Sequence, residues 1–391
     1  MTRHFRQQTG EEQRATWLEL FFDLVYVFAI TQLSRGLLAD PSAVGLLHTG
    51  FLLLVVWWAW INTTWMANWF DPEAVPVRLV LIGGMLASLL MAVAVPASFT
   101  GDGLLFAGAY VALQVGRNIF NVVVADKDSE YAASFRRLLA WSLGSAPLWI
   151  AGAMLEGNGR VVLWTAALAM DYAAPSLRYW TPGLGSSTFE EWAIEGAHFA
   201  ERFQLFVIIA LGESIVVTGT TASSAGARAE IVIALVVCFL GSAALWWLYF
   251  DRIAGFAQAR MRDAGEDSGQ LGRDAYTYLH IPIVAGIVLA AVGDELAIAH
   301  PGDDASMFGS FAIVGGPALY LLGHLLFRFR MVKRTSKPWI VALLVLSALV
   351  PVGASVQIPM LALAGTSTLV LVLLLVYDAA RRRAAEAQRP S

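Results

Sequence analysis

Residues 43–66 read AVGLLHTGFLLLVVWWAWINTTWM, without a single aspartate, glutamate, lysine or arginine. A helix needs about 20 mostly apolar residues to cross the hydrocarbon core of a bilayer, and this stretch is long enough to do so. Comparable apolar runs recur between residues 16 and 380. The sequence therefore predicts an all-α, polytopic membrane protein.

The composition of the whole chain supports this class. Of its 391 residues, 58% are hydrophobic and 14% are charged, and the mean hydropathy is +0.63. A soluble domain usually carries about a quarter charged residues, and a chain of this length cannot enclose so much apolar surface away from water. The lipid bilayer is therefore the expected partner. Nucleic acid is not, because the net charge is only −4 and the basic residues lie in short flanks between apolar runs.

The apolar runs divide into two sets of six, which gives about twelve transmembrane helices. A tight turn at Pro359 alone separates the last two runs. The predicted spans are residues 16–38, 43–66, 78–97, 103–124, 135–155 and 158–178, followed by 199–220, 228–250, 275–297, 305–327, 337–357 and 359–380.

The positions of the basic residues agree with this count. If the N-terminus is cytoplasmic and every run crosses, 22 of the 26 lysines and arginines lie on the cytoplasmic side. Cytoplasmic loops of membrane proteins carry such an excess, so both termini are expected in the cytoplasm. Residues 1–14 are polar, with no short apolar core before a cleavage site, so no cleaved signal peptide is expected. The four exceptions are Arg35, Arg160 and Arg228, which would lie outside, and Arg117, which would lie within a span.

The two halves of the chain also resemble each other. Six is an even number of spans, so the halves would share one orientation and form parallel repeats about an axis along the membrane normal. The predicted domains are residues 1–180, the first six-helix repeat, and residues 199–391, the second repeat with a basic cytoplasmic tail. The matching features keep their order: Glu19 and Phe21 with Glu201 and Phe203, Trp57-Trp58 with Trp246-Trp247, Gly108/Gly116 with Gly315/Gly323, and Asp171 with Asp378.

Residues 181–198 form a predicted connector between the repeats. Ser187 or Thr188 can cap a short helix there, with a glutamate completing the capping box. Its aromatic and acidic residues alternate at helical spacing, which indicates an amphipathic helix at the membrane interface. The aromatic face comprises Phe189, Trp192 and Phe199, and the acidic face comprises Glu190, Glu191 and Glu195.

Charged and polar residues inside spans are the strongest indicators of a site, because a charge at the bilayer centre costs at least about 2.5–3.5 kcal/mol. Glu213 follows Glu201 by twelve residues, roughly 18 Å along a helix, which places it near the midplane. Ser214 lies beside it, and the equivalent part of the first span carries Thr31 and Gln32. These four polar residues are the leading candidates for a solute or ion path.

Glu19 and Asp23 form a second candidate group, one turn apart on one face of the first span. The sequence leaves two interpretations open for them. They line the path, or they have a structural role in which Glu19 pairs with Arg14 and Asp23 pairs with a neighbouring arginine.

Arg117 and Asn118 form the third group. An arginine inside a span needs a carboxylate partner, and Glu213, Asp23 and Asp171 are the candidates. A structural ion pair is the favoured interpretation of Arg117.

No motif for an enzyme, a metal or a cofactor is present in the sequence. A Gly-rich phosphate loop, a CxxC pair, a nucleophile elbow and an HExxH motif are all missing, and the six histidines are spread along the chain. Cys238, the one cysteine, lies in an apolar run and cannot form an intrachain disulfide. Asp294 and Glu295, near the outer end of the ninth span, are expected to meet water. We therefore predict no catalytic residue and no cofactor.

Two segments carry a family resemblance. Residues 19–30, ELFFDLVYVFAI, and residues 201–214, ERFQLFVIIALGES, are similar to the bacterial low temperature requirement protein A (LtrA) family, and the resemblance extends over nearly the whole chain. It implies a multi-pass protein of the bacterial inner membrane. The family name records a growth phenotype and implies no particular chemistry.

The leading functional hypothesis is a transporter or channel that moves a small solute or ion along a path between the two halves. The alternative is an intramembrane enzyme or lipid-handling protein that uses buried carboxylates as acid–base groups. No feature of the sequence favours a structural or signalling role. The sequence is compatible with a homo-oligomer. A water-accessible path past Glu213 would distinguish transport from the other roles.

Overall fold

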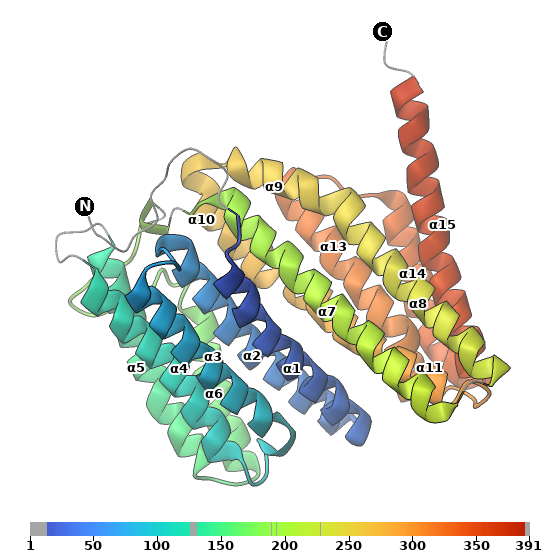
Figure 1. Ribbon diagram of the computed structural model, residues 1–391, viewed down its shortest axis with the longest axis horizontal. Helices are drawn as coiled ribbons and strands as arrows, with labels where there is room; N and C mark the ends of the chain where they lie inside the picture. The colour runs from blue at the N-terminus through green and yellow to red at the C-terminus, as the bar shows by residue number, and fades with distance from the viewer. Residues whose placement is uncertain (1–13, 126–130, 189, 193, 227, 388–391) are drawn as a thin grey trace. The chain divides into compact units, whose positions relative to one another are not determined.

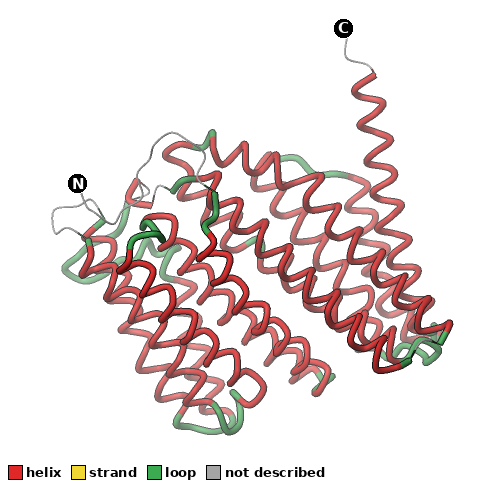
Figure 2. Tube along the Cα trace, in the orientation of Figure 1, coloured by secondary structure: helices red, strands yellow, loops and turns green. Residues whose placement is uncertain are grey.

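The computed structural model describes residues 14–125, 131–188, 190–192, 194–226 and 228–387. Within these ranges the chain forms helices joined by short loops and contains no strand (Figure 2). The long helices are α1 (Trp17–Ala39), α2 (Ala43–Trp69), α3 (Val75–Ala94), α4 (Gly103–Val124), α5 (Ala132–Ala153), α6 (Asn158–Ala173), α7 (Gly196–Ala225), α8 (Ala229–Tyr249), α11 (Ile281–Ala299), α13 (Gly316–Val332), α14 (Lys337–Val356) and α15 (Met360–Ala387). Shorter elements are η1 (Val95–Ala97), η2 (Glu190–Trp192), η3 (Phe250–Ala254), α9 (Gly255–Arg262), η4 (Gly265–Asp267), α10 (Ser268–Leu271), η5 (Gly272–Tyr278), α12 (Met307–Ser310) and η6 (Phe311–Gly315).

Nine helical stretches of the described chain are long and apolar enough to cross a membrane. They include α1, α2, α3, α7, α8, α14 and α15, together with the stretches Ser268–Ala299 and Met307–Val332. Helices α4, α5 and α6 are not among them, because α6 has only 16 residues and polar residues such as Arg117 and Arg137 interrupt α4 and α5. The chain is thus an all-helical protein with multiple candidate spans. The count of twelve stays a prediction.

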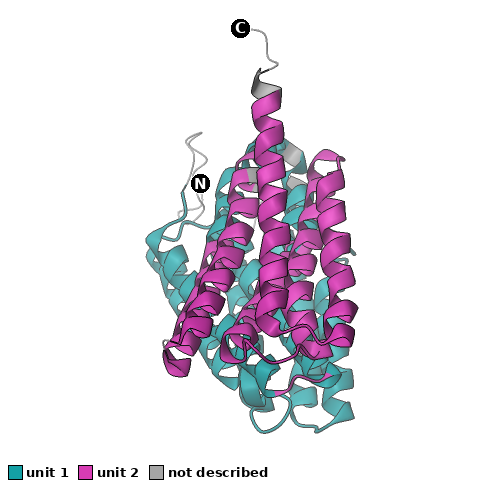
Figure 3. Ribbon diagram, turned by 90° about the vertical axis from the view of Figure 1, so that its right-hand side faces the viewer, with its two compact units in different colours: residues 1–39, 43–205, 258–277 teal, residues 40–42, 206–257, 278–391 magenta. Residues whose placement is uncertain are grey.

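The chain divides into two compact units (Figure 3). Unit 1 comprises residues 1–39, 43–205 and 258–277, and unit 2 comprises residues 40–42, 206–257 and 278–391. The first part of α7 and the segment 258–277 therefore cluster with the first six helices, although the sequence assigned them to the second repeat.

In unit 1, α1 packs against α2 and α3, α4 packs between α3 and α5, and α5 packs against α6 (Figure 1). Aromatic rings fill the region where α2 meets α7, with the centroids of Trp60 and Phe203 5.0 Å apart. The segment 258–277 returns to this unit through a close backbone contact. A Cβ on Gly269 would lie 2.4 Å from the carbonyl oxygen of Trp192, so only glycine fits there.

The connector differs from its prediction. Its described residues contain the single 3₁₀ turn η2 and no α-helix before Gly196. The ring of Trp192 stacks on Tyr179 at 5.0 Å and also contacts Trp65 and Trp69. Trp192 of the predicted aromatic face therefore packs inside unit 1, and Phe189 lies outside the described residues.

In unit 2, α11 packs closely against α13, α8 packs against α15, and α14 packs against both α13 and α15. Glycine allows α11 and α13 to approach closely, because a Cβ on Gly286 would lie 2.5 Å from the backbone nitrogen of Tyr320. Small residues permit such approaches between membrane helices.

The residues that suggested a repeat have different surroundings in the two halves. Trp57 and Trp58 are buried, whereas Trp246 and Trp247 are 46% and 54% exposed. A Cβ on Gly323 would lie 2.7 Å from the Ile283 side chain, whereas nothing lies within 4 Å of the same position on Gly108 or Gly116. The two-repeat arrangement stays a prediction, and these paired positions pack differently.

Candidate functional site

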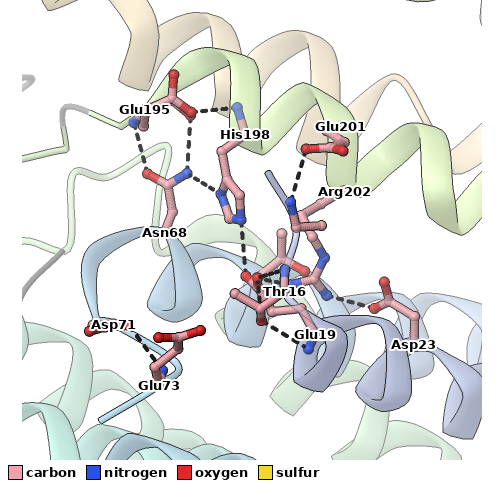
Figure 4. A network of polar contacts seen from close by, with 12 residues as sticks. Thr16, Glu19, Asp23, Asn68, Asp71, Glu73, Glu195, His198, Glu201 and Arg202 are labelled. Atoms are coloured by element: carbon pink, nitrogen blue, oxygen red, sulfur yellow. Dashed lines mark hydrogen bonds and ion pairs between the residues drawn. The ribbon is translucent and has the colours of Figure 1, made fainter. Parts of the chain in front are cut away.

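Two pairs of ionisable side chains meet in unit 1, and we call Glu19, Asp23, His198 and Arg202 the ionic cluster (Figure 4). Glu19 and Asp23 lie one turn apart on α1, and His198 and Arg202 lie one turn apart at the start of α7. Arg202 Nη1 lies 3.0 Å from Glu19 Oε1, and Arg202 Nη2 lies 2.6 Å from Asp23 Oδ1. His198 Nε2 lies 3.1 Å from Glu19 Oε1. None of the four side chains is more than 1% exposed.

Neighbouring groups donate further hydrogen bonds to the carboxylates of Glu19 and Asp23. The indole N–H of Trp60 donates to Asp23 Oδ1 at 2.8 Å. The backbone N–H and the hydroxyl of Thr16 donate to Glu19 Oε2 at 2.8 and 2.9 Å. Hydrogen bonding to the charged form stabilises a buried carboxylate, so the cluster satisfies most of its own polar groups.

Asn68 fixes the tautomer of His198. Asn68 Oδ1 accepts the backbone N–H of Glu195 at 2.8 Å, so its Nδ2 is the end that faces His198 Nδ1, at 3.1 Å. Nδ1 is then an acceptor, and the ring proton is on Nε2, which lies 3.1 Å from Glu19 Oε1. The histidine is neutral in this arrangement.

The charges of the ionic cluster do not cancel. Glu19 and Asp23 bring two negative charges, and Arg202 brings one positive charge. Asp23 Oδ2 has no hydrogen-bond partner among the described residues. The cluster can therefore hold one additional proton, but its burial leaves no direct access for a solute.

A cavity of about 30 Å³ lies elsewhere in unit 1, and we call it the arginine pocket. A water molecule needs roughly 10–15 Å³ of such space, so two or three waters or a small polar group would fit. Arg117, which is 5% exposed, lines it from α4. The full lining is Trp58, Asn62, Gln114, Arg117, Asn118, Leu138, Trp141, Ser142, Asp171, Ala174 and Tyr179.

Arg117 makes no ion pair within the described part of the chain. Its guanidinium donates from Nη1 to Thr63 Oγ1 at 3.2 Å and from Nη2 to Gln114 Oε1. A guanidinium has five N–H donors, and these two partners are neutral. The positive charge therefore faces the pocket without direct compensation.

Asp171 is the one carboxylate that lines the arginine pocket, and it is held by other groups. The hydroxyl of Tyr110 donates to Asp171 Oδ2 at 2.8 Å, and the indole N–H of Trp149 donates to the same oxygen at 3.2 Å. Asp171 was one of the three partners that the sequence suggested for Arg117. The two residues face one cavity instead of forming a direct pair.

A second cavity, of about 50 Å³, lies next to the arginine pocket and shares the lining residues Trp58, Asn62 and Tyr179 with it. We call it the aromatic pocket, because Trp65 and Trp192 also line it. Its remaining lining residues are Ile61, Pro175, Arg178, Ser187, Thr188, Gly269, Gln270, Arg273 and Thr277.

The backbone of Tyr179 has an unusual conformation where the two pockets meet. Tyr179 and the preceding Arg178 have φ angles of 51° and 52°. Non-glycine residues rarely adopt this left-handed region, and such outliers cluster at functional sites.

The other residues predicted from the sequence are divided between the units. Thr31 and Gln32 of α1 are partly exposed, and the Thr31 hydroxyl donates to its own helix at Val27 O, 3.0 Å away. Glu213 and Ser214 are 5% and 2% exposed and belong to unit 2. Glu19 and Asp23 lie together in the ionic cluster, and Arg117 and Asn118 lie together in the arginine pocket. The predicted pairing of Glu19 with Arg14 is replaced by contacts with Arg202 and His198.

Several residues of the site were missed in the sequence. Arg202 follows Glu201 in an apolar helix, and His198 precedes Arg202 by one turn. A basic pair at this spacing complements the acidic pair Glu19 and Asp23, and that complementarity was the available signal. Tyr179 and Trp192 lie far in sequence from Arg117, so nothing local indicated that they belong near it.

These features define a class, a multi-pass helical membrane protein with buried charges and internal cavities. The chain matches the family model described as bacterial low temperature requirement A protein over residues 14–376, and it belongs to that family. It is also 40% identical over 327 residues to an uncharacterized protein of Rhizobium meliloti (strain 1021), covering 82% of this chain and 79% of that protein. No solved structure matches it.

Proposed function

We propose that the chain is a membrane transporter or channel for a small solute that carries an anionic group, and that this group binds at Arg117. The observation that carries the proposal is a buried arginine that faces a cavity while its hydrogen-bond partners are neutral. Arg202 in the ionic cluster, by contrast, contacts two carboxylates.

The charges around the two cavities favour an anion. Arg117, Arg178 and Arg273 line them, although Arg273 is paired with Asp274 at 2.8 Å, and Asp171 is the one carboxylate among the described lining residues. The guanidinium fork matches the geometry of a carboxylate or a phosphate group. A solute with one such group would compensate Arg117 at its charged end.

The aromatic pocket suits the rest of the solute. Small-molecule sites are mostly apolar with a few placed polar groups, and this pocket combines three tryptophans with hydroxyl and amide side chains. Its volume of about 50 Å³ restricts the solute to a small molecule. We therefore propose an organic anion with a compact apolar or aromatic body.

The wider proposal concerns the arrangement in the membrane. The chain would have twelve spans in the bacterial inner membrane, as two parallel six-helix repeats with both termini cytoplasmic and a path between the halves. The excess of Lys and Arg in alternate loops supports this orientation. A reporter that matures only in the cytoplasm, fused to each terminus in turn, tests it, and a periplasmic C-terminus would mean an odd number of spans.

The binding test uses purified protein in detergent with benzoate and acetate as probes, and with benzamide and benzylamine as neutral and cationic controls. We expect the carboxylates to raise the unfolding temperature and the two controls to leave it unchanged. Arg117→Gln should abolish this response. Arg136→Gln, an exposed arginine on α5, is the matched control and should keep it.

Uptake of radiolabelled benzoate into proteoliposomes then distinguishes a transporter from a protein that only binds the solute. Equal stabilisation by benzylamine, or a full benzoate response in Arg117→Gln, would contradict the proposed site.

A further inference from the structure

A third cavity lies in unit 2, where α8, α11, α13 and α15 contribute its walls. We call it the aspartate pocket, because Asp294 of α11 is the one charged residue that lines it. We infer that this pocket binds a single alkali metal cation. Its volume of about 20 Å³ leaves room for one water-sized particle, and therefore for one dehydrated ion.

Hydroxyl groups surround the carboxylate. Ser242, Ser367 and Thr368 all line the pocket together with Asp294. Ser367 is 4% exposed, and its Oγ has no hydrogen-bond partner among the described residues. A buried hydroxyl without a partner is costly unless a ligand supplies the contact, so Ser367 indicates a missing ligand.

Thr368 can also contribute an oxygen. Its hydroxyl donates to the backbone carbonyl of Val237 at 3.2 Å, which uses its hydrogen and leaves acceptor lone pairs. Hard cations are bound by such oxygen atoms together with carboxylates.

The backbone beside the pocket is irregular where α13 begins. The π-helical element η6 precedes α13, and both Ile313 and Pro317 line the cavity. Pro317 has no backbone N–H, so it cannot donate to the carbonyl of Ile313 four residues earlier. Irregular helices of membrane transporters use such carbonyls to coordinate cations.

The charge of the site favours a monovalent cation. Among the described residues, one carboxylate faces the pocket, and no arginine, lysine or histidine lines it. A divalent ion would keep a net positive charge in this apolar surrounding, whereas an alkali metal ion is neutralised by Asp294 alone. The sequence predicted that Asp294 meets water at the end of its span, but it is partly buried and shares a cavity with three hydroxyl groups.

Close helix contacts hold the oxygen atoms in place. A Cβ on Gly241 of α8 would lie 3.0 Å from Thr368 Oγ1, so glycine keeps α8 close to α15. On the same helix, Cys238 Sγ lies 3.9 Å from the backbone oxygen of Asp294 and donates to it. These contacts bring α8 near α11, which carries Asp294, and near α15, which carries Ser367 and Thr368.

The test measures thermal unfolding of the purified full chain and equilibrium binding of ²²Na⁺. Choline chloride is replaced by NaCl, KCl or LiCl at constant ionic strength. We expect at least one alkali metal ion to raise the unfolding temperature of the wild type in a saturable way. Asp294→Asn should abolish this response. Asp304→Asn is the control, because it removes an exposed carboxylate of the same unit, and it should keep the response.

Ser367→Ala keeps the proposal testable if Asp294→Asn does not fold. Loss of one oxygen ligand should weaken the affinity for the cation by about tenfold, which corresponds to roughly 1.4 kcal/mol. The inference is overturned if no alkali metal ion affects the wild type, if stability responds to pH alone, or if Asp294→Asn or Ser367→Ala retains the full response. Benzoate binding at Arg117 is a separate measurement, so either proposal can fail alone.

Discussion

Arg202 and Arg117 are both buried arginines of unit 1, and their surroundings differ. Arg202 contacts two carboxylates, at 3.0 and 2.6 Å, in a cluster closed to solvent. Arg117 contacts a hydroxyl group and an amide group and faces a cavity of about 30 Å³. Burial of a charge therefore does not by itself identify a binding site. The proposed site at Arg117 rests instead on incomplete charge compensation next to a cavity.

The largest expected effect is on Arg202. Arg202→Gln should lower the free energy of unfolding by about 3–5 kcal/mol, because it leaves Glu19 and Asp23 buried without their cation. Thermal unfolding of the purified protein and its yield in membranes measure the loss. Arg136→Gln serves as the control and should behave like the wild type. Normal stability of the Arg202→Gln protein would contradict the structural role of Arg202.

Arg117→Gln should have a smaller effect on stability and a larger one on binding. The substitution loses hydrogen bonds to neutral partners, worth about 1–3 kcal/mol, and strands no carboxylate in direct contact. We expect benzoate affinity to fall by tenfold or more in the binding assay. A stability loss equal to that of Arg202→Gln would mean that Arg117 is structural as well.

A neutral hydrogen bond in the same unit provides a reference for these charged contacts. The hydroxyl groups of Tyr26 and Ser88 are 2.9 Å apart and both buried. Tyr26→Phe should therefore cost about 1 kcal/mol of unfolding free energy with no change in solute binding. A loss as large as that of Arg202→Gln would show that the assay does not separate charged from neutral contacts.

The smallest expected effect on stability concerns Glu213, which is 5% exposed in α7. Glu213→Gln keeps the shape and the hydrogen-bonding capacity of the side chain, so it should change the unfolding free energy by less than about 1 kcal/mol. If Glu213 lies on a path, the substitution should abolish uptake in proteoliposomes. Strong destabilisation would instead indicate a structural ion pair, and normal uptake in a stable protein would contradict both roles.

The helices were predictable from the sequence because lipid imposes a length and a composition on each span. Residues 43–66 were predicted as a span, and α2 runs from Ala43 to Trp69. The predicted amphipathic helix is absent from the described residues of the connector, which contain the 3₁₀ turn η2 before Gly196. The aromatic spacing of the connector matched a helix, but Trp192 packs against residues that are distant in sequence.

The candidate sites were predictable only in part. Arg117 and Asn118 were identified because a polar pair inside an apolar run is costly. The proposed ligand oxygens around Asp294 come from helices far apart in the chain, and no local pattern links Ser242 to Ser367. Partners across helices depend on tertiary packing, which no local pattern in the sequence reveals.

Cys238 has a practical consequence. It is the single cysteine of the chain, it is 1% exposed, and its sulfur lies against the backbone of Asp294. A maleimide probe can thus react at one position only, and reaction requires α8 and α11 to separate. The labelling rate therefore reports how often this helix contact opens in an unmodified, wild-type chain. A bound cation at Asp294 is expected to slow that rate.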